Sequence, residues 1–345
     1  MVPWLRMAVR PLRRMWAAAA VGLFGASCAA PPAPPTPAPT VVHEEGPEQR
    51  RGASGLLRIT AEQQAQIRDL CAQTPAAPQD APWTGLINDS HVHTAMENDQ
   101  SAFAIALLKE MNASGVQRAL LQPDHAPGLF EHAGFLRAVR AMEVSWADIA
   151  ALCPRLVPLV YAFDPDDPAS IDYVRERLDT GWYGGVGEVE LQHVHLPIKH
   201  APRSATMEAI YDLLDERQML LHFQASPRLD PTLVDTVLTI AREHPGARFL
   251  WFSCPPMDQT GWPPNLGCGT LVHQESRGVR DGVRGLWGSD SAPDGFKNSS
   301  RGVLPYHDVT GAVQQARVTF AQLEEDPSGL AATRFDALVP TLPTR

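Results

Sequence analysis

The stretch Leu86-Ile87-Asn88-Asp89-Ser90-His91-Val92-His93 decides the fold, because it reads as an apolar-led strand that ends in two histidines. Residues i and i+2 of a strand point to the same side, so both imidazoles emerge together at its C-terminal end. Two convergent imidazoles form a metal-binding geometry. Twelve histidines in 345 residues produce some chance neighbours, so the metal interpretation depends on what the rest of the chain offers.

From residue 86 onward, short β-rich runs alternate with segments of helical period, which predicts eight βα units around a parallel sheet. The predicted strands are 86–93, 116–122, 156–163, 184–191, 218–224, 247–253, 265–270 and 284–290. The predicted helices are 99–114, 130–151, 168–180, 204–217, 230–244, 275–283 and 308–325. We therefore expect an α/β fold, a (β/α)8 TIM-type barrel with parallel strands, and a doubly wound open sheet is the alternative.

The connection after the sixth predicted strand differs from the others. Residues 254–264 are rich in Pro and Gly, which leaves little room for a regular helix. The sequence therefore predicts an abbreviated sixth βα connection, with a loop in place of a helix.

The N-terminal segment predicts export. Four arginines before residue 15 precede an apolar run over 16–24, which is typical of a bacterial signal peptide over 1–28. The small residues before Cys28 resemble a lipobox, with Gly25 where a leucine is usual, so Cys28 is the predicted lipidation site. Arg13-Arg14 also resembles a twin-arginine signal, and the general secretory route is the other alternative. The expected location is the periplasm, with the chain anchored to the bacterial membrane as a lipoprotein.

The rest of the chain divides in two by composition. Residues 29–54 are a Pro/Ala-rich linker, whose composition cannot bury a core. Residues 55–345 are the predicted barrel domain, a length that suits one α/β barrel. The formal net charge of −10 without a basic block argues against nucleic acid as a partner. We expect a small-molecule substrate and membrane contact through the lipid anchor only, and the oligomeric state stays open.

The cysteines also bear on the compartment. Four remain after Cys28, and an exported location permits disulfides among them. They are Cys71, Cys153, Cys254 and Cys268. Their pairing cannot be read from sequence. Cys254 with Cys268 is one arrangement, and a buried thiol at Cys254 is another.

Metal-capable residues fall at the ends of several predicted strands, where barrel enzymes carry their sites. Besides the first-strand pair, the fourth strand contains Glu188 and Glu190, the fifth His222, and the eighth Asp290. Each has a simpler interpretation: His222 as a core histidine, Asp290 as a turn cap, and the two glutamates at a solvated strand end. Burial of two carboxylates inside a barrel would be costly without a cation or strong donors.

The order of these motifs resembles the amidohydrolase superfamily, and within it the amidohydrolase-related branch of metal-dependent hydrolases and decarboxylases. The resemblance covers the domain from Ile87 to about Leu338. The motifs that carry it are Asp89-Ser90-His91-Val92-His93, Gly187-Glu188, Leu221-His222, Pro264-Asn265-Leu266 and Trp287-Gly288-Ser289-Asp290.

The resemblance implies a role for each residue. His91, His93 and His222 would bind one divalent metal, and Glu188 would be a further ligand or a bridge. Asp290 would complete the shell or lie beside the metal-bound water, accept its proton and deliver it to the leaving group, so Asp290 and His222 are the predicted catalytic residues. The metal is expected to be zinc, with manganese or iron as alternatives. The implied activity is hydrolysis of a C–N or C–O bond, and a nonoxidative decarboxylase is the enzymatic alternative.

One position departs from the family pattern. Relatives commonly read Trp-Ala-His at the end of the sixth strand, where this chain has Ser253 in place of the histidine. Reduced or lost activity and a noncatalytic barrel lipoprotein are therefore alternatives, and a mononuclear site is another. Candidate substitutes for the missing histidine are Cys254, His125, His193, His195 and His273. A loop position is the simpler interpretation of His193 and His195.

Overall fold

The computed structural model describes residues 59–76, 79–94, 99–123, 133–192, 200–225, 230–252, 262–271, 285–288, 339 and 341–342. These residues belong to one compact unit, Glu48–Arg345. The predicted signal peptide, the lipidation site Cys28 and the linker 29–54 lie outside the described residues. None of the described helices combines the length and the apolar character needed to cross a bilayer.

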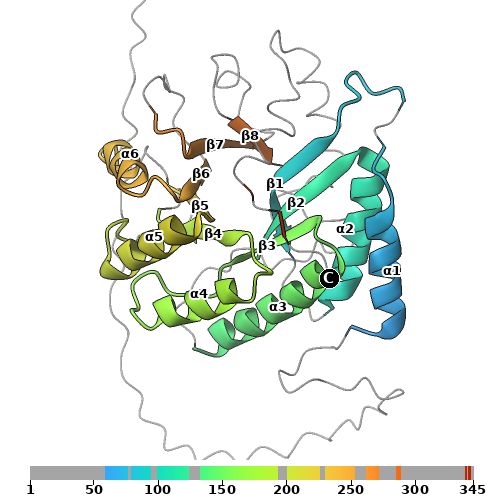
Figure 1. Ribbon diagram of the computed structural model, residues 1–345, viewed down its shortest axis with the longest axis horizontal. Helices are drawn as coiled ribbons and strands as arrows, with labels where there is room; N and C mark the ends of the chain where they lie inside the picture. The colour runs from blue at the N-terminus through green and yellow to red at the C-terminus, as the bar shows by residue number, and fades with distance from the viewer. Residues whose placement is uncertain are drawn as a thin grey trace, which may run out of the picture. The chain divides into compact units, whose positions relative to one another are not determined.

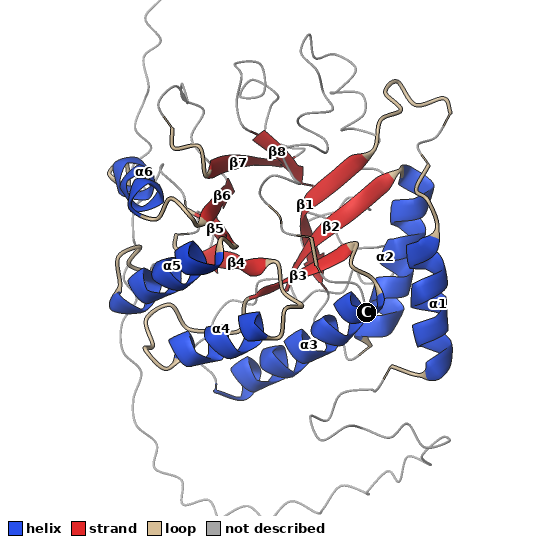
Figure 2. Ribbon diagram, in the orientation of Figure 1, coloured by secondary structure: helices blue, strands red, loops and turns tan. Residues whose placement is uncertain are grey.

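Eight parallel strands form a single sheet in chain order, β1 to β8, and the sheet curls round until β8 contacts β1 (Figures 1 and 2). The strands are β1 (Ile87–Thr94), β2 (Val116–Pro123), β3 (Leu156–Val160), β4 (Gly185–Glu190), β5 (Leu220–Gln224), β6 (Arg248–Phe252), β7 (Leu266–Leu271) and β8 (Gly285–Gly288). Each coincides within a few residues with a predicted strand, so the prediction of a parallel α/β barrel is confirmed.

The described helices lie outside the ring of strands (Figure 2). They are α1 (Ala61–Ala72), α2 (Gln100–Ser114), α3 (Ala133–Leu152), α4 (Ser170–Asp179), α5 (Ala205–Arg217) and α6 (Leu233–Glu243). All but α1 were predicted. The predicted helices 275–283 and 308–325 and most of the sixth connection lie outside the described residues.

The helix α1 precedes the barrel and was missed by the sequence analysis. Its first turn has a capping box, in which the Thr60 hydroxyl accepts from Gln63 N and the Gln63 side chain accepts from Thr60 N. Ile67 is its fully buried apolar residue. A helix that buries so narrow a face gives a weak periodic signal, and the capping box was the sequence feature that could have revealed it.

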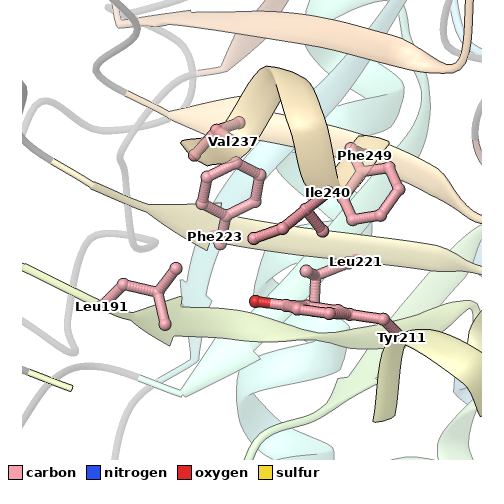
Figure 3. A pocket seen from close by; sticks show the side chains of 7 residues that line it. All are labelled: Leu191, Tyr211, Leu221, Phe223, Val237, Ile240 and Phe249. Carbon is pink, nitrogen blue, oxygen red and sulfur yellow. The ribbon is translucent and has the colours of Figure 1, made fainter. Parts of the chain in front are cut away.

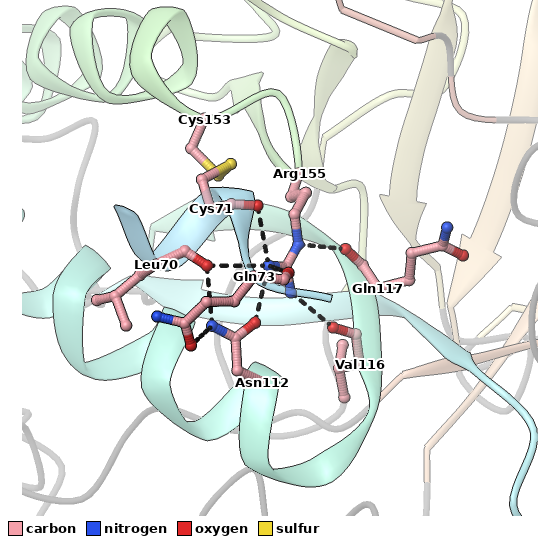
Figure 4. The surroundings of a disulfide bond; sticks show 8 residues. All are labelled: Leu70, Cys71, Gln73, Asn112, Val116, Gln117, Cys153 and Arg155. Carbon is pink, nitrogen blue, oxygen red and sulfur yellow. Dashed lines mark hydrogen bonds between the residues drawn. A yellow bond between two sulfur atoms is a disulfide. The ribbon is translucent and has the colours of Figure 1, made fainter. Parts of the chain in front are cut away.

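A disulfide and an arginine hold α1 against the barrel (Figure 4). Cys71, near the end of α1, is bonded to Cys153, directly after α3. The Arg155 guanidinium donates to the carbonyls of Leu70, Cys71, Gln73, Val116 and Gln117 and to the Asn112 side chain. Burial lowers the pKa of Arg155 to about 10, so the group stays charged at neutral pH. The pairing of Cys254 with Cys268 stays a prediction, because Cys254 lies outside the described residues.

Large apolar side chains fill the space between the sheet and the helices. Figure 3 shows one such layer, where α5 and α6 cover β5 and β6 around a small apolar cavity. Its walls are Leu191, Tyr211, Leu221, Phe223, Val237, Ile240 and Phe249. The outward-facing side chains of these strands therefore pack against the helices. Polar side chains can lie on the inner face of the sheet and at the strand ends.

Glu143 is a buried carboxylate on α3, remote in sequence from the histidines. It accepts hydrogen bonds from Tyr161 N, Ala162 N and the Tyr173 hydroxyl, and its own carbonyl accepts from the Tyr183 hydroxyl at 2.9 Å. Burial raises its pKa from 4.5 to about 7, although these donors act in the opposite direction. The folded chain therefore binds a proton at Glu143 that the unfolded chain releases between pH 4.5 and about 7.

We expect Glu143 to make the fold less stable as pH rises through this window. Because the folded pKa is the higher one, the penalty is absent below pH 4.5 and complete above about 7, where it reaches about 3 kcal/mol at about 1.4 kcal/mol per pH unit. The neutral variant Glu143→Gln does not carry this penalty. Between pH 5 and pH 8 its free energy of unfolding should therefore rise, relative to that of the native chain, by most of that amount. Urea unfolding of both chains at the two pH values measures this, and parallel pH profiles would contradict it.

Candidate metal centre

The two histidines of β1 meet as their spacing predicted. Every residue of β1 is buried, and His91 and His93 are 3% and 5% exposed. Their rings lie edge to face with centroids 4.7 Å apart, and their Nε2 atoms are 3.0 Å apart. The pairing of β1 with β2 shifts register between Asp89 and Val92. This irregularity brackets His91 and lies beside the candidate ligands.

Glu188 of β4 and His222 of β5 lie beside His91. One donor atom from each of these three side chains lies within 4.8 Å of the others. Glu188 Oε2 is 3.6 Å from His91 Nε2, and His222 Nε2 is 3.4 Å from His91 Nδ1. Glu188 and His222 are 1% and 0% exposed. The structure thus brings together three predicted ligands from three strands, while His93 contacts His91 from outside this group.

Two residues that the sequence analysis did not select also reach the centre. Gln122, near the end of β2, places its side-chain nitrogen 2.8 Å from His91 Nε2 and 3.1 Å from Glu188 Oε2. Phe252, the last residue of β6, lies over His91 with ring centroids 3.9 Å apart, and its ring is 5.0 Å from that of His222. Each lies at the C-terminal end of a strand, and that position was the sequence feature that could have identified both as site residues.

A small cavity, about the size of one water molecule, lies beside Glu188. It is lined by Tyr161, Phe163, Pro165, Glu188, Val189, Glu190 and His200. Glu190 is only 5% exposed, so the solvated alternative for this residue is wrong. His200 Nδ1 is 2.7 Å from Asp166 Oδ2, and with Asp164 these residues form a second, more exposed group of metal-capable side chains. Glu188 of the buried centre and His200 of this second group therefore line one cavity.

The donor set fits a divalent metal. Two imidazoles and a carboxylate are the ligands that zinc takes in catalytic sites with three protein ligands, and they also suit manganese and iron. A carboxylate as buried as Glu188 needs strong donors or a cation nearby. Gln122 Nε2, 3.1 Å from Glu188 Oε2, is one such donor, and a bound cation would balance the charge of the carboxylate.

Several predicted site residues lie outside the described residues. Asp290 follows β8, which ends at Gly288, and Ser253 follows β6, which ends at Phe252. The proposed substitutes for the missing histidine, Cys254, His125, His193, His195 and His273, also lie there. Their roles stay predictions.

The chain is similar to several solved structures, whereas its sequence matches no protein family. No model of a protein family and no curated protein matches the sequence. A solved structure of an amidohydrolase II is 14% identical, with a TM-score of 0.47 over 73% of this chain and 96% of its own. An uncharacterised TIM-barrel protein from Bordetella bronchiseptica is 10% identical, with a TM-score of 0.48 over 73% of this chain and 97% of its own.

A third solved structure is a probable 2-pyrone-4,6-dicarboxylic acid hydrolase from Acinetobacter baumannii. It is 13% identical, with a TM-score of 0.41 over 71% of this chain and 98% of its own. Identities this low say nothing about a shared activity.

Proposed function

We propose that this protein is a metal-dependent hydrolase of the amidohydrolase superfamily that cleaves a C–N or C–O bond in a small substrate. The observation that supports the proposal is the convergence of His91, Glu188 and His222, all buried, with donor atoms within 4.8 Å of one another. They come from β1, β4 and β5, near the strand ends where barrel enzymes carry out their chemistry. The proposed cofactor is one divalent ion, zinc first and manganese or iron as alternatives.

The proposed chemistry assigns a task to each group. A bound divalent ion would supply Lewis acidity, polarising the substrate carbonyl and lowering the pKa of water. His91 and His222 would hold it through ring nitrogens and Glu188 through a carboxylate oxygen. Asp290 would accept a proton from the attacking water and donate it to the leaving group. The substrate would bind at the C-terminal ends of the strands, and Phe252 would keep bulk water away from the His91 ring.

The cellular setting is also a proposal. We propose an exported lipoprotein anchored through Cys28, since residues 1–28 read as a signal peptide. The disulfide between Cys71 and Cys153 supports an oxidising compartment, because cytosolic proteins rarely keep such bonds.

The test is elemental analysis of the purified chain, prepared without chelator, with a screen of ester, lactone and amide hydrolysis. We expect about one divalent metal per chain, and its loss together with activity in the His91→Ala/His93→Ala variant. His244→Ala is the matched control: this histidine, 8% exposed, contacts Asp212 and Glu208 on α5 and should leave the metal in place.

Absence of metal after reconstitution with zinc and manganese would contradict the proposal. The same holds for a metal content that His91→Ala/His93→Ala leaves unchanged. Either result would favour the alternative of a noncatalytic barrel.

A further inference from the structure

The amide group of Gln122 lies inside the donor set of the proposed metal centre. Its Nε2 atom is 2.8 Å and 3.0 Å from the two ring nitrogens of His91 and 3.1 Å from Glu188 Oε2. The side chain is fully buried, and its Oε1 atom has no hydrogen-bond partner among the described residues. One end of the amide therefore lacks a partner within the described polypeptide, whichever way the group is turned. A buried polar atom without a partner destabilises the folded chain.

The two ends of a glutamine amide exchange places by half a turn of the terminal group, and which end is oxygen is assigned from the hydrogen-bond network. The NH2 end suits a position between two acceptors, Glu188 and a neutral His91. The oxygen end in the same position suits a cation, since amide and carboxylate oxygens are ordinary ligands of hard divalent ions. Donor atoms that share one zinc ion lie about 3 Å apart, near the separations of Gln122 from His91 and Glu188.

Strand register explains why Gln122 can join the ligand set. Gln122 of β2 is the direct partner of His93 in β1, so both side chains stand at one level of the barrel. The group whose donor atoms lie within 4.8 Å of one another contains His91, Glu188 and His222, without His93. Gln122, in contact with both His91 and Glu188, is therefore placed to provide a further donor.

We propose that Gln122 is a ligand of the divalent ion through its amide oxygen, an inference that rests on the proposed metal-dependent function. With His91, His222 and Glu188 it would supply two nitrogens and two oxygens with a single negative charge, and the water of the proposed hydrolysis would take a fifth position. A divalent ion with these ligands keeps a net positive charge. It is therefore a stronger Lewis acid than the same ion held by two carboxylates.

The test uses the full chain, with Co²⁺ and Zn²⁺ as probes. Gln122→Leu keeps the approximate size of the side chain and removes its polar atoms, and Gln122→Glu keeps an oxygen donor. We expect Gln122→Leu to weaken binding by more than the roughly 10- to 100-fold typical of outer-shell partners, in competition with a chromophoric chelator, and to change the visible spectrum of bound Co²⁺. Gln122→Glu should bind at least as tightly as the native chain.

His222→Ala separates this inference from the proposed function. If His222→Ala loses Co²⁺ while Gln122→Leu keeps native affinity and spectrum, the metal centre stands and Gln122 is not its ligand. A weakened Gln122→Leu with an unchanged Co²⁺ spectrum also overturns direct ligation, since the residue would then act by positioning Glu188. If the native chain binds neither ion, both proposals fail. Circular dichroism establishes that each variant is folded.

Discussion

Gly187→Ala is expected to destabilise the fold by about 4 kcal/mol or more and to release the metal from the proposed centre. Gly187 has φ +139°, and a β-carbon there would lie 2.2 Å from the carbonyl oxygen and 2.8 Å from Cβ of His222. Contacts below 3.0 Å force backbone to move, and here the backbones belong to the strands that carry Glu188 and His222. The register between β4 and β5 already shifts at this point, between Val186 and Val189. The methyl group would therefore separate two proposed ligands.

Gly181→Ala is the matched control for backbone conformation. Gly181 also has positive φ, +76°, but a β-carbon there meets nothing within 4 Å. Its substitution should cost about 1–2 kcal/mol from the left-handed conformation alone and leave metal content unchanged. Urea unfolding followed by tryptophan fluorescence and metal per chain measure both variants. Equal stability and equal metal content in the two would show that β4 can move away from His222 without cost.

The strands and most helices could be predicted from sequence. A strand that is buried on both faces of the sheet appears in the sequence as a short apolar run, and such runs alternate with segments of helical period. Runs such as Leu156–Val160 and Leu220–Gln224 are short, apolar and bounded by polar or turn residues, as the strands of a covered parallel sheet must be. The helix α1 was not predicted because it precedes the first strand and so lies outside the alternation of strands and helices. Ile67 alone is fully buried in it, so its pattern resembles that of a surface segment.

The part of the site that could be predicted consists of residue types that commonly bind metals. His91, Glu188 and His222 are recognised ligand types at strand ends, and the structure brings them together. Gln122 was missed because an amide is seldom a ligand, and only strand register shows that it stands beside His93. Phe252 was missed for a similar reason, since an aromatic residue in an apolar strand reads as core. The contact of Phe252 with His91 depends on closure of the barrel, which brings β6 across from β1.

Removal of the disulfide with Cys71→Ala/Cys153→Ala is expected to lower the free energy of unfolding by about 4 kcal/mol. The bond spans a sequence separation of 82 residues, and a loop of that length has much conformational entropy in the unfolded chain once the bond is absent. In the folded chain Arg155 still donates to the carbonyls of Leu70, Cys71 and Gln73. The end of α1 should therefore stay in place, and the loss should come mainly from the unfolded state.

Arg155→Met distinguishes the two contributions, because it removes the hydrogen bonds to α1 and leaves the disulfide. In that variant α1 stays tethered but its last carbonyls lose their donor, so amide hydrogen exchange in Ala61–Ala72 should accelerate. In Cys71→Ala/Cys153→Ala the same amides should stay protected under native conditions while the urea midpoint falls. A change below about 1 kcal/mol in the double variant would contradict the loop-entropy argument. Fast exchange throughout α1 in that variant would show that the disulfide, and not Arg155, holds this helix on the barrel.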